Sequence, residues 1–266
     1  MTFGPLSAPP PRWKLGVLSL AGFVTFFGAW YLTAHAALVP AAFLPSPEVV
    51  LKELVRITHE PFVGYTIQQH LASSLSRFAL GFGIAVVVGV PLGLMMGWSE
   101  WLDSALTPLF NALRFVAPVA WVPFAALWFG TGFGGPGLII FTGAFPPALI
   151  NAYRGAKLVD RRLVEAAQTL GARTPHIIRH VLLPGSVPSI IAGLRVSAGL
   201  GWQSLIGAEL IVASSGIGYL IVKGQTGIRT ATVISGMIAI GMVGFIIDAL
   251  LRRLEVRIYS KRGGRP

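Results

Sequence analysis

Six long apolar stretches dominate the pattern of hydrophobic and polar positions along the 266-residue chain. A helix needs roughly 20 apolar residues to cross about 30 Å of hydrocarbon, and each stretch reaches or approaches that length. The stretches are Leu15–Val39, Phe78–Trp98, Phe115–Gly130 (extended backward along the chain), Gly137–Tyr153, Ile190–Ala213 and Ala231–Leu251. The pattern therefore predicts an all-α, polytopic membrane protein with about six transmembrane helices.

Composition supports this prediction and adds a domain organisation. Hydrophobic residues make up 54% of the chain and charged residues 12%, which lies outside the range of ordinary soluble domains. The first apolar stretch is longer than the core of a signal peptide, so we interpret it as a retained span. The sequence thus predicts an N-terminal tail over residues 1–14, one transmembrane domain over residues 15–251 and a basic tail over residues 252–266.

Lysine and arginine residues are distributed unevenly between the two sides of the predicted spans. The formal net charge is +11, and its clustering beside spans points to membrane orientation rather than nucleic-acid binding. The cations on the side of the termini are Arg12, Lys14, Arg154, Lys157, Arg161, Arg162, Arg173, Arg179, Arg252, Arg253, Arg257, Lys261, Arg262 and Arg265. The opposite side carries Lys52, Arg56, Lys223 and Arg229. The positive-inside rule therefore predicts that both termini and the segment between the fourth and fifth spans lie in the cytoplasm.

Small residues recur at every fourth position in two of the spans. The rows comprise Ala85, Gly89, Gly93 and Gly97 in the second span and Gly193, Ser197 and Gly201 in the fifth. Such rows let helix backbones approach closely, and we expect packing within one bundle rather than a dedicated dimer seam. The prolines at 118, 123, 146 and 147 predict interrupted helices, which suit a transporter or channel, although kinked packing alone would also explain them.

Few charged residues fall within the predicted spans. Arg77 and Arg195 lie near predicted ends, where snorkelling explains them, and Asp248 is placed to pair with Arg252 one turn later. A carboxylate facing lipid would be costly, so Glu209 should face the bundle interior, a cavity or a cationic partner. A structural role and a pathway role both remain open for Glu209 and for Arg114. The candidates for a translocation pathway are Arg114, Trp202, Gln203 and Glu209.

A basic, helix-forming segment over residues 160–185 separates the fourth and fifth spans. Asp160 is a suitable N-cap for a short helix that ends before Gly171. Thr174 is a suitable N-cap for a second short helix, with Pro175 at its first position. The second helix carries an apolar stripe made of Ile177, Ile178, Val181 and Leu182. The apolar stripe of this hairpin must be buried against another surface, either the chain's own spans or another protein.

The same segment resembles the signature of permease subunits in binding-protein-dependent ABC importers. That motif reads E-A-A, three residues, G, nine residues, I-x-L-P, and this chain keeps the spacing and departs only at Val181. The matching residues are Glu165, Ala166, Ala167, Gly171, Val181, Leu183 and Pro184. Further stretches resemble the nitrate, sulfonate and taurine branch of the family: 44–54, 113–132, 163–172 and 213–221.

The resemblance implies an ABC importer permease fold in which the hairpin is a coupling helix that docks on a cytoplasmic ATPase. It also implies a second permease copy, most simply in a homodimer with the pathway between subunits, a dimer of ATPases that binds ATP and Mg²⁺, and a periplasmic or lipid-anchored substrate-binding protein. The resemblance implies import of a small anionic solute of the nitrate, sulfonate or taurine type by alternating access, through a multi-pass protein of the bacterial inner membrane. Pyrimidine, flavin and aromatic-acid compounds remain alternatives within that branch.

The chain itself shows no motif for catalysis. It lacks the G-x-x-x-x-G-K-[ST] phosphate-binding loop, has no H-E-x-x-H pattern and contains no cysteine, so we expect no ATPase activity, resident cofactor or metal in this subunit. Residues 214–230 are rich in glycine and predict an outer mouth, a short re-entrant helix or an ordinary loop. The main functional alternative is an ATP-independent secondary transporter or channel.

Overall fold

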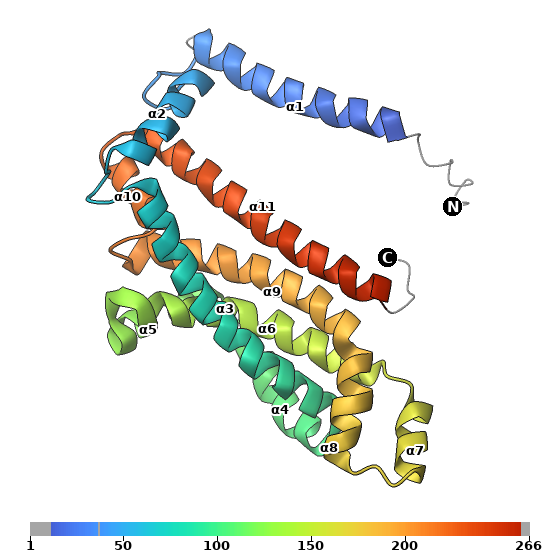
Figure 1. Cartoon of the computed structure of the whole chain (residues 1–266). Coiled ribbons are helices and arrows are strands. Elements are labelled where there is room, and N and C mark those ends of the chain that lie inside the picture. Colours follow the sequence, from blue (N-terminus) through green and yellow to red (C-terminus); the bar gives the residue numbers. More distant parts are fainter. Residues whose placement is uncertain (1–11, 37, 262–266) are drawn as a thin grey trace, which may run out of the picture.

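The computed structural model describes residues 12–36 and 38–261, which form a bundle of helices (Figure 1). The elements are α1 (Arg12–His35), α2 (Pro47–His59), α3 (Ile67–Trp98), α4 (Glu100–Leu113), η1 (Pro118–Trp121), α5 (Val122–Phe129), η2 (Gly130–Gly134), α6 (Gly135–Lys157), α7 (Arg161–Thr169), α8 (Thr174–Ile177), η3 (Ile178–Leu182), α9 (Leu183–Val212), α10 (Ile217–Thr226) and α11 (Thr230–Lys261). Among the described residues, five helices are long and apolar enough to cross a membrane, and a bent pair makes a sixth. The all-α, polytopic architecture with about six spans is confirmed.

The third span, predicted over residues 115–130, is interrupted at Pro118, one of the positions where the sequence predicts a break. α4 and the η1–α5 segment meet at a bend of 86°. Proline explains the break: Ala117 is extended (φ −57°, ψ 139°) because Pro118 disfavours helical geometry at the preceding residue, and Pro118 has no N–H to donate to the preceding turn. The predicted break at Pro118 is therefore confirmed. The breaks predicted at Pro146 and Pro147 are wrong, because α6 runs through both residues.

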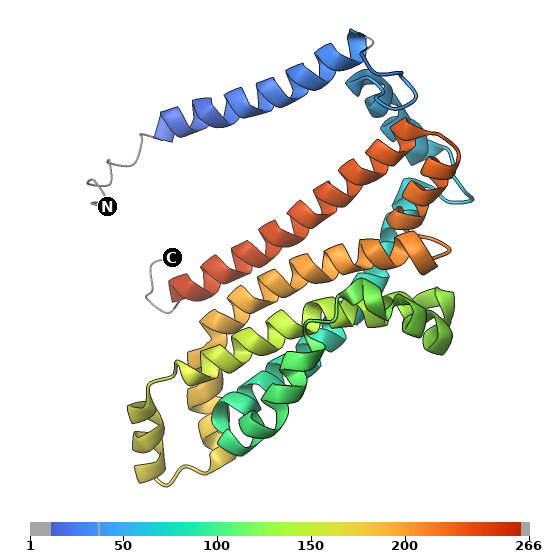
Figure 2. The same cartoon turned by 180° about the vertical axis from the view of Figure 1, so that it is seen from behind.

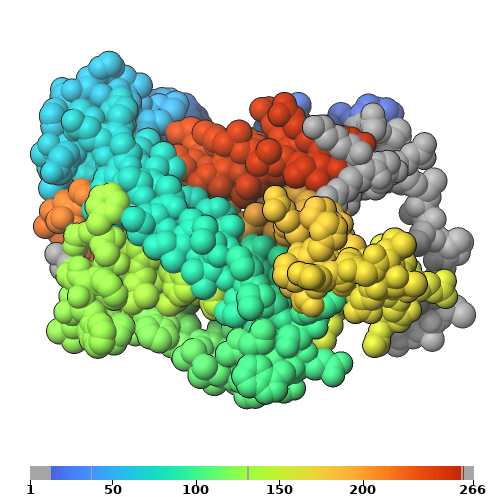
Figure 3. Space-filling model, turned by 60° about the horizontal axis from the view of Figure 1, so that its bottom comes forward, coloured from blue at the N-terminus to red at the C-terminus, as the bar shows by residue number. Residues whose placement is uncertain are grey.

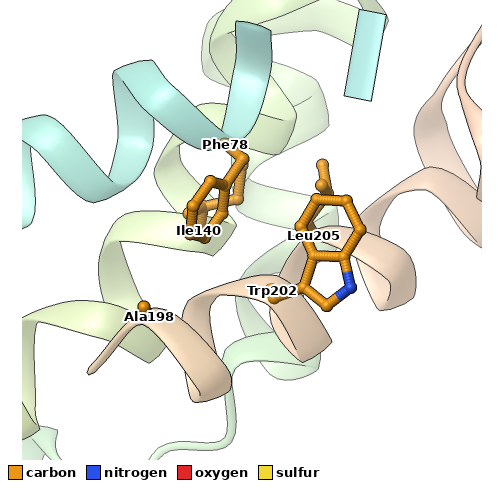
Figure 4. Close-up of a cluster of buried hydrophobic side chains, with 5 residues drawn as sticks. All are labelled: Phe78, Ile140, Ala198, Trp202 and Leu205. Carbon is orange, nitrogen blue, oxygen red and sulfur yellow. The ribbon is translucent and has the colours of Figure 1, made fainter. Parts of the chain in front are cut away.

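The core of the bundle is made by α3, α6 and α9. Phe78, Ile140 and Trp202 are buried together with Ala198 and Leu205 (Figure 4). The rings of Phe78 and Trp202 meet edge to face, with centroids 5.5 Å apart, which is a favoured aromatic geometry.

Both rows of small residues pack against α6. A Cβ added to Gly93 on α3 would lie 2.9 Å from the Cβ of Ala152, and one added to Gly201 on α9 would lie 3.1 Å from the Cβ of Ala144. The Ser197 hydroxyl of the second row donates to the Ala144 carbonyl. The predicted packing within one bundle is confirmed, because α6 is the shared neighbour of both rows.

The two ends of the bundle differ in the segments they carry. The start of α1, the end of α11 and the whole of α7 lie toward one end, which we call the basic end, and α2 and α10 lie at the opposite end (Figures 1 and 2). α11 continues to Lys261, so residues 252–261 of the predicted tail are helical. α1 begins at Arg12, and residues 1–11 and 262–266 of the two predicted tails lie outside the described residues.

Candidate coupling segment and translocation cavity

The hairpin at the basic end begins as the sequence predicts. The Asp160 side chain accepts a hydrogen bond from the Arg162 N–H at 2.9 Å and so caps α7. At the other end of α7, Gly171 adopts φ +78°, where a residue with a side chain is strained. The Ala172 N–H then donates to the Ala167 carbonyl at 3.0 Å, which closes the turn.

The second half of the hairpin differs from the prediction in two respects. Its first hydrogen bonds are accepted by the carbonyl of Arg173, so Arg173 is the N-cap and Thr174 already lies in the helix. The expectation that Thr174 caps this helix was wrong because its backbone is already helical. Nor is the second helix short: α8, η3 and α9 form one helical path from Thr174 to Val212.

The apolar stripe of that second helix is covered by the chain itself. Ile177 and Leu182 are buried, and Leu182 packs with Leu94 of α3 and Ala152 and Ala156 of α6. The stripe is therefore core, which answers the question left open by its sequence.

α7 is exposed, in contrast to the helix that follows it. Glu165 and Ala166 are exposed, Ala167 is half-buried, and Leu163 and Leu170 are 58% and 88% exposed. In the space-filling view α7 projects from the edge of the bundle (Figure 3, yellow). At the far end of the motif, Val181 and Pro184 are half-buried and Leu183 is exposed. Within the described chain, the Glu165 face thus remains available to another molecule.

Glu209 lies in a buried ion pair near the opposite end of the bundle. Its carboxylate lies 3.0 Å from Arg77 Nη1, accepts from the Ser74 hydroxyl at 2.8 Å and accepts from the Gly218 N–H at 3.0 Å. The side chains of Arg77 and Glu209 are 3% and 0% exposed. The pair joins α3 to α9 and to the start of α10.

Arg77 completes this network from α3. Its guanidinium also donates to the Ser215 carbonyl at 2.7 Å and to the Ser215 hydroxyl at 2.8 Å. The prediction that Arg77 snorkels from a span end was wrong. α3 begins at Ile67 rather than at Phe78, which places Arg77 inside the helix. The missed signal was Ser74 and Arg77 three residues apart, a spacing that aligns polar side chains on one helix face.

Glycines shape the loop that reaches this ion pair. Gly216 has φ +111°, a backbone conformation that L side chains rarely adopt, and its N–H donates to His70 Nδ1 at 3.1 Å. A Cβ at Gly218 would lie 2.6 Å from the Cβ of Glu209. The predicted short helix is present as α10, yet Gly218 and Gly224 lie inside it, so close packing rather than a tight turn explains them.

Asp248 also has a different partner from the one predicted. Its carboxylate accepts from Arg195 Nε at 2.5 Å and from Nη2 at 3.0 Å, and Arg195 Nη1 lies 3.6 Å from Glu255. The expected pairing with Arg252 was wrong, because the neighbouring α9 supplies a better-placed guanidinium. This bidentate pair joins α9 to α11.

Of the four pathway candidates, two line the same cavity and the other two are buried in separate places. Arg114 and Gln203 line the same cavity, of about 330 Å³, beside Thr142 and Ser204. Trp202 is buried in the core, and Glu209 is buried in its ion pair. The structure brings together only Arg114 and Gln203, one from the break after α4 and the other from α9. Among the described residues, no group of three or more histidine, aspartate or glutamate side chains is placed to hold a metal ion.

Comparison with known proteins agrees with this architecture. Residues 89–259 match the family model described as "Binding-protein-dependent transport system inner membrane component". The chain is 35% identical over 256 residues to the taurine transport system permease protein TauC of Escherichia coli, covering 95% of this chain and 93% of that protein. It is 34% identical over 253 residues to the putative aliphatic sulfonates transport permease protein SsuC of Bacillus subtilis, covering 94% and 88%.

A solved structure has the same fold at low sequence identity. A chain of the MetNI methionine ABC transporter matches with a TM-score of 0.64 and 17% identity, covering 72% of this chain and 95% of that chain. The family match and the relatives confirm the resemblance carried by Glu165, Ala166, Ala167 and Gly171. The chain belongs to the family of binding-protein-dependent transport system inner membrane components, the permease subunits of ABC importers.

Proposed function

We propose that this chain forms the translocation pathway of an ATP-driven importer for a small anionic solute of the sulfonate or nitrate type. The observation that carries the proposal is α7: a capped helix with the family motif whose Glu165 face has no cover within the described chain. A separate ATPase dimer binds α7 and holds ATP and Mg²⁺. A substrate-binding protein delivers the solute at the opposite end.

The connections of α7 support its role in coupling. α6 ends at Lys157, just before α7, and the helical path from Thr174 to Val212 begins just after it. These neighbours also line the Arg114 cavity, α6 through Thr142 and α9 through Gln203. A displacement of α7 by the ATPase therefore passes to both walls of the cavity, which is the coupling that alternating access requires.

The proposed arrangement places α7 and both termini in the cytoplasm of the cell. The support is the charge asymmetry: Arg154, Lys157, Arg161 and Arg173 lie at the basic end. A second permease copy completes the pathway, and the relatives named for taurine and aliphatic sulfonates support a solute that carries a negatively charged sulfonate group. Selection among such solutes falls mainly to the binding protein.

The test is ATP-driven uptake of radiolabelled taurine by proteoliposomes that contain this chain, its co-purifying ATPase and a loaded binding protein. An exposed Ala166→Glu substitution on α7 should bury an unpaired charge at the ATPase contact and abolish stimulated ATP hydrolysis and uptake. The matched control is Ala166→Ser, which keeps a small uncharged side chain at the same exposed position and should retain both activities. Uptake without an ATPase would instead support a secondary transporter or channel.

A further inference from the structure

The cavity beside α6 and α9 combines a small polar wall with a short apolar wall. Arg114, Thr142, Gln203 and Ser204 supply the polar groups, and Val116, Val119 and Leu200 supply apolar surface. Its volume of about 330 Å³ lies at the small end of the range for ligand pockets, about 300–1,000 Å³. A solute of a few heavy atoms fits such a space.

The cavity lies deep in the predicted membrane region. It contacts α6 at Thr142, Gly143, Pro146 and Pro147, and Pro146 is the twelfth of the 23 residues of that helix. The lining residues therefore lie near the middle of the span, where an ionisable side chain is costly and marks a functional site by default. Arg114 lines the same cavity and is thus placed away from the membrane boundaries.

Arg114 lacks the charge compensation found elsewhere in the bundle. No carboxylate of the described residues forms an ion pair with it, and its guanidinium lies over the Phe115 ring at 4.8 Å. The Gln203 side chain is exposed and makes no hydrogen bond within the described chain. Unpaired N–H donors therefore lie on two sides of the cavity.

The two hydroxyl groups of the cavity are already committed as donors. Thr142 Oγ1 donates to the Ile139 carbonyl at 2.9 Å, and Ser204 Oγ donates to the Leu200 carbonyl at 2.7 Å. The free donors are the planar guanidinium of Arg114 and the amide of Gln203. A guanidinium binds two oxygens of one oxoanion in a bidentate manner and carries the compensating charge.

From this geometry we propose that Arg114 and Gln203 bind the anionic head group of the transported solute, with Leu200 and Val116 against its carbon chain. The ligand class is a small oxoanion, with a sulfonate as the best fit to a bidentate donor beside apolar surface. This inference rests on the proposed function and assigns it a site. Binding here also neutralises Arg114, so a charged solute is favoured over a neutral one of equal shape.

The test uses the absence of cysteine from the chain. In membrane vesicles that hold the assembled complex, Thr142→Cys provides one thiol in the permease, and its alkylation rate reports occupancy of the cavity. The probes are ethanesulfonate and its uncharged isostere ethyl methyl sulfone, applied without nucleotide and after trapping with ATP and vanadate.

Ethanesulfonate should slow alkylation about tenfold or more in at least one of the two states, and the sulfone should leave the rate unchanged. Adding Arg114→Gln should remove the protection. Arg114→Lys keeps the charge but lacks the planar pair of N–H donors, so it should retain part of the protection. Equal protection by the sulfone, protection that survives Arg114→Gln, or no protection in either state would overturn the proposal. Alkylation in the nucleotide-free state requires no ATP hydrolysis, so protection in that state does not depend on coupling. Failed coupling would affect only the vanadate-trapped state and would count against the proposed function.

Discussion

Arg77 and Arg114 both carry a guanidinium group within the spans of this bundle, yet they differ in exposure and in polar partners. Arg77 is 3% exposed and is bound to Glu209 and Ser215. Arg114 is exposed, lines a cavity and forms no ion pair with a described carboxylate. The charge of Arg77 is therefore compensated within the fold, whereas the charge of Arg114 remains available to a ligand.

The difference shows that a charge within a span has to be interpreted through its partners. Arg77 and Arg114 are the same residue type, and both lie within spans, where ionisable groups are rare. Their positions in the sequence therefore do not distinguish their roles. A buried, hydrogen-bonded pair such as Arg77 with Glu209 holds elements in register. An unbonded donor that faces a cavity is placed to compensate an incoming charge.

The largest expected effect comes from breaking the Arg77–Glu209 pair on one side. Glu209→Leu leaves the Arg77 guanidinium buried without its carboxylate, and Arg77→Met leaves the reverse. Each should lower the free energy of unfolding by about 3–5 kcal/mol. Thermal unfolding of the purified complex, monitored by size-exclusion chromatography, measures the loss.

The double variant Arg77→Met with Glu209→Leu is the control for this prediction. It leaves no unpaired buried charge, so it should be less destabilised than the sum of the single variants. Single variants that unfold at the wild-type temperature would show that the pair does not hold α3 to α9.

A smaller effect is expected from crowding the same pair through the backbone. Gly216→Ala meets the Glu209 carboxylate and also strains a residue at φ +111°, so it should destabilise the complex by about 1–3 kcal/mol. Gly64→Ala is the matched control, because Gly64 has φ +84° with open space around its Cβ position. Equal losses in the two variants would mean that backbone strain alone, and not the contact with Glu209, sets the cost.

The Gly171→Val substitution tests the basic end of the bundle, which lies outside the spans that hold Arg77 and Arg114. Gly171 has φ +78° and open space around its Cβ position, so strain of about 1–3 kcal/mol should fall on the turn after α7. The spans should remain folded, and association with the ATPase should weaken. Pull-down of the ATPase at matched permease amounts measures this. Wild-type association together with wild-type uptake would count against α7 as the docking helix.

The smallest effect is expected for a half-buried ion pair on α2, which lies outside the spans. Arg56 donates to Glu53 at 2.7 and 2.8 Å, and this hydrogen bonding lowers the pKa of Glu53. A lowered carboxyl pKa stabilises the fold above the unfolded pKa, and the contribution is lost as the pH falls through the folded pKa. Glu53→Gln should cost about 0.2–1 kcal/mol at neutral pH and nothing at acidic pH. A loss independent of pH would contradict this.

The sequence predicted those features that depend on neighbouring residues. Span number follows from apolar length, the start of α7 follows from Asp160, and the turn after it follows from Gly171. The features it missed depend on residues that are far apart along the chain. Arg77 pairs with Glu209, 132 positions away, and Arg195 pairs with Asp248, 53 positions away. The spacing of neighbouring residues does not indicate either pairing.

The candidate site was predictable to the same limited extent. Arg114, Trp202, Gln203 and Glu209 all stood out as polar or aromatic residues in or beside spans, yet only Arg114 and Gln203 share a cavity. The deciding factor is the bend of 86° in the third span, which depends on how Pro118 redirects the chain against α6 and α9. The sequence indicated that Pro118 would interrupt the helix, but it did not indicate the direction in which the chain turns.

The most direct test of the account measures stability and uptake on the same preparations of Arg77→Gln and Arg114→Gln. If one charge holds the fold and the other binds the solute, Arg77→Gln should lower the unfolding temperature of the complex. Arg114→Gln should keep the wild-type unfolding temperature and lose about tenfold in taurine uptake per assembled complex, equivalent to about 1.4 kcal/mol. Wild-type uptake in Arg114→Gln, or equal destabilisation by both substitutions, would contradict the separation of the two charges into structure and pathway.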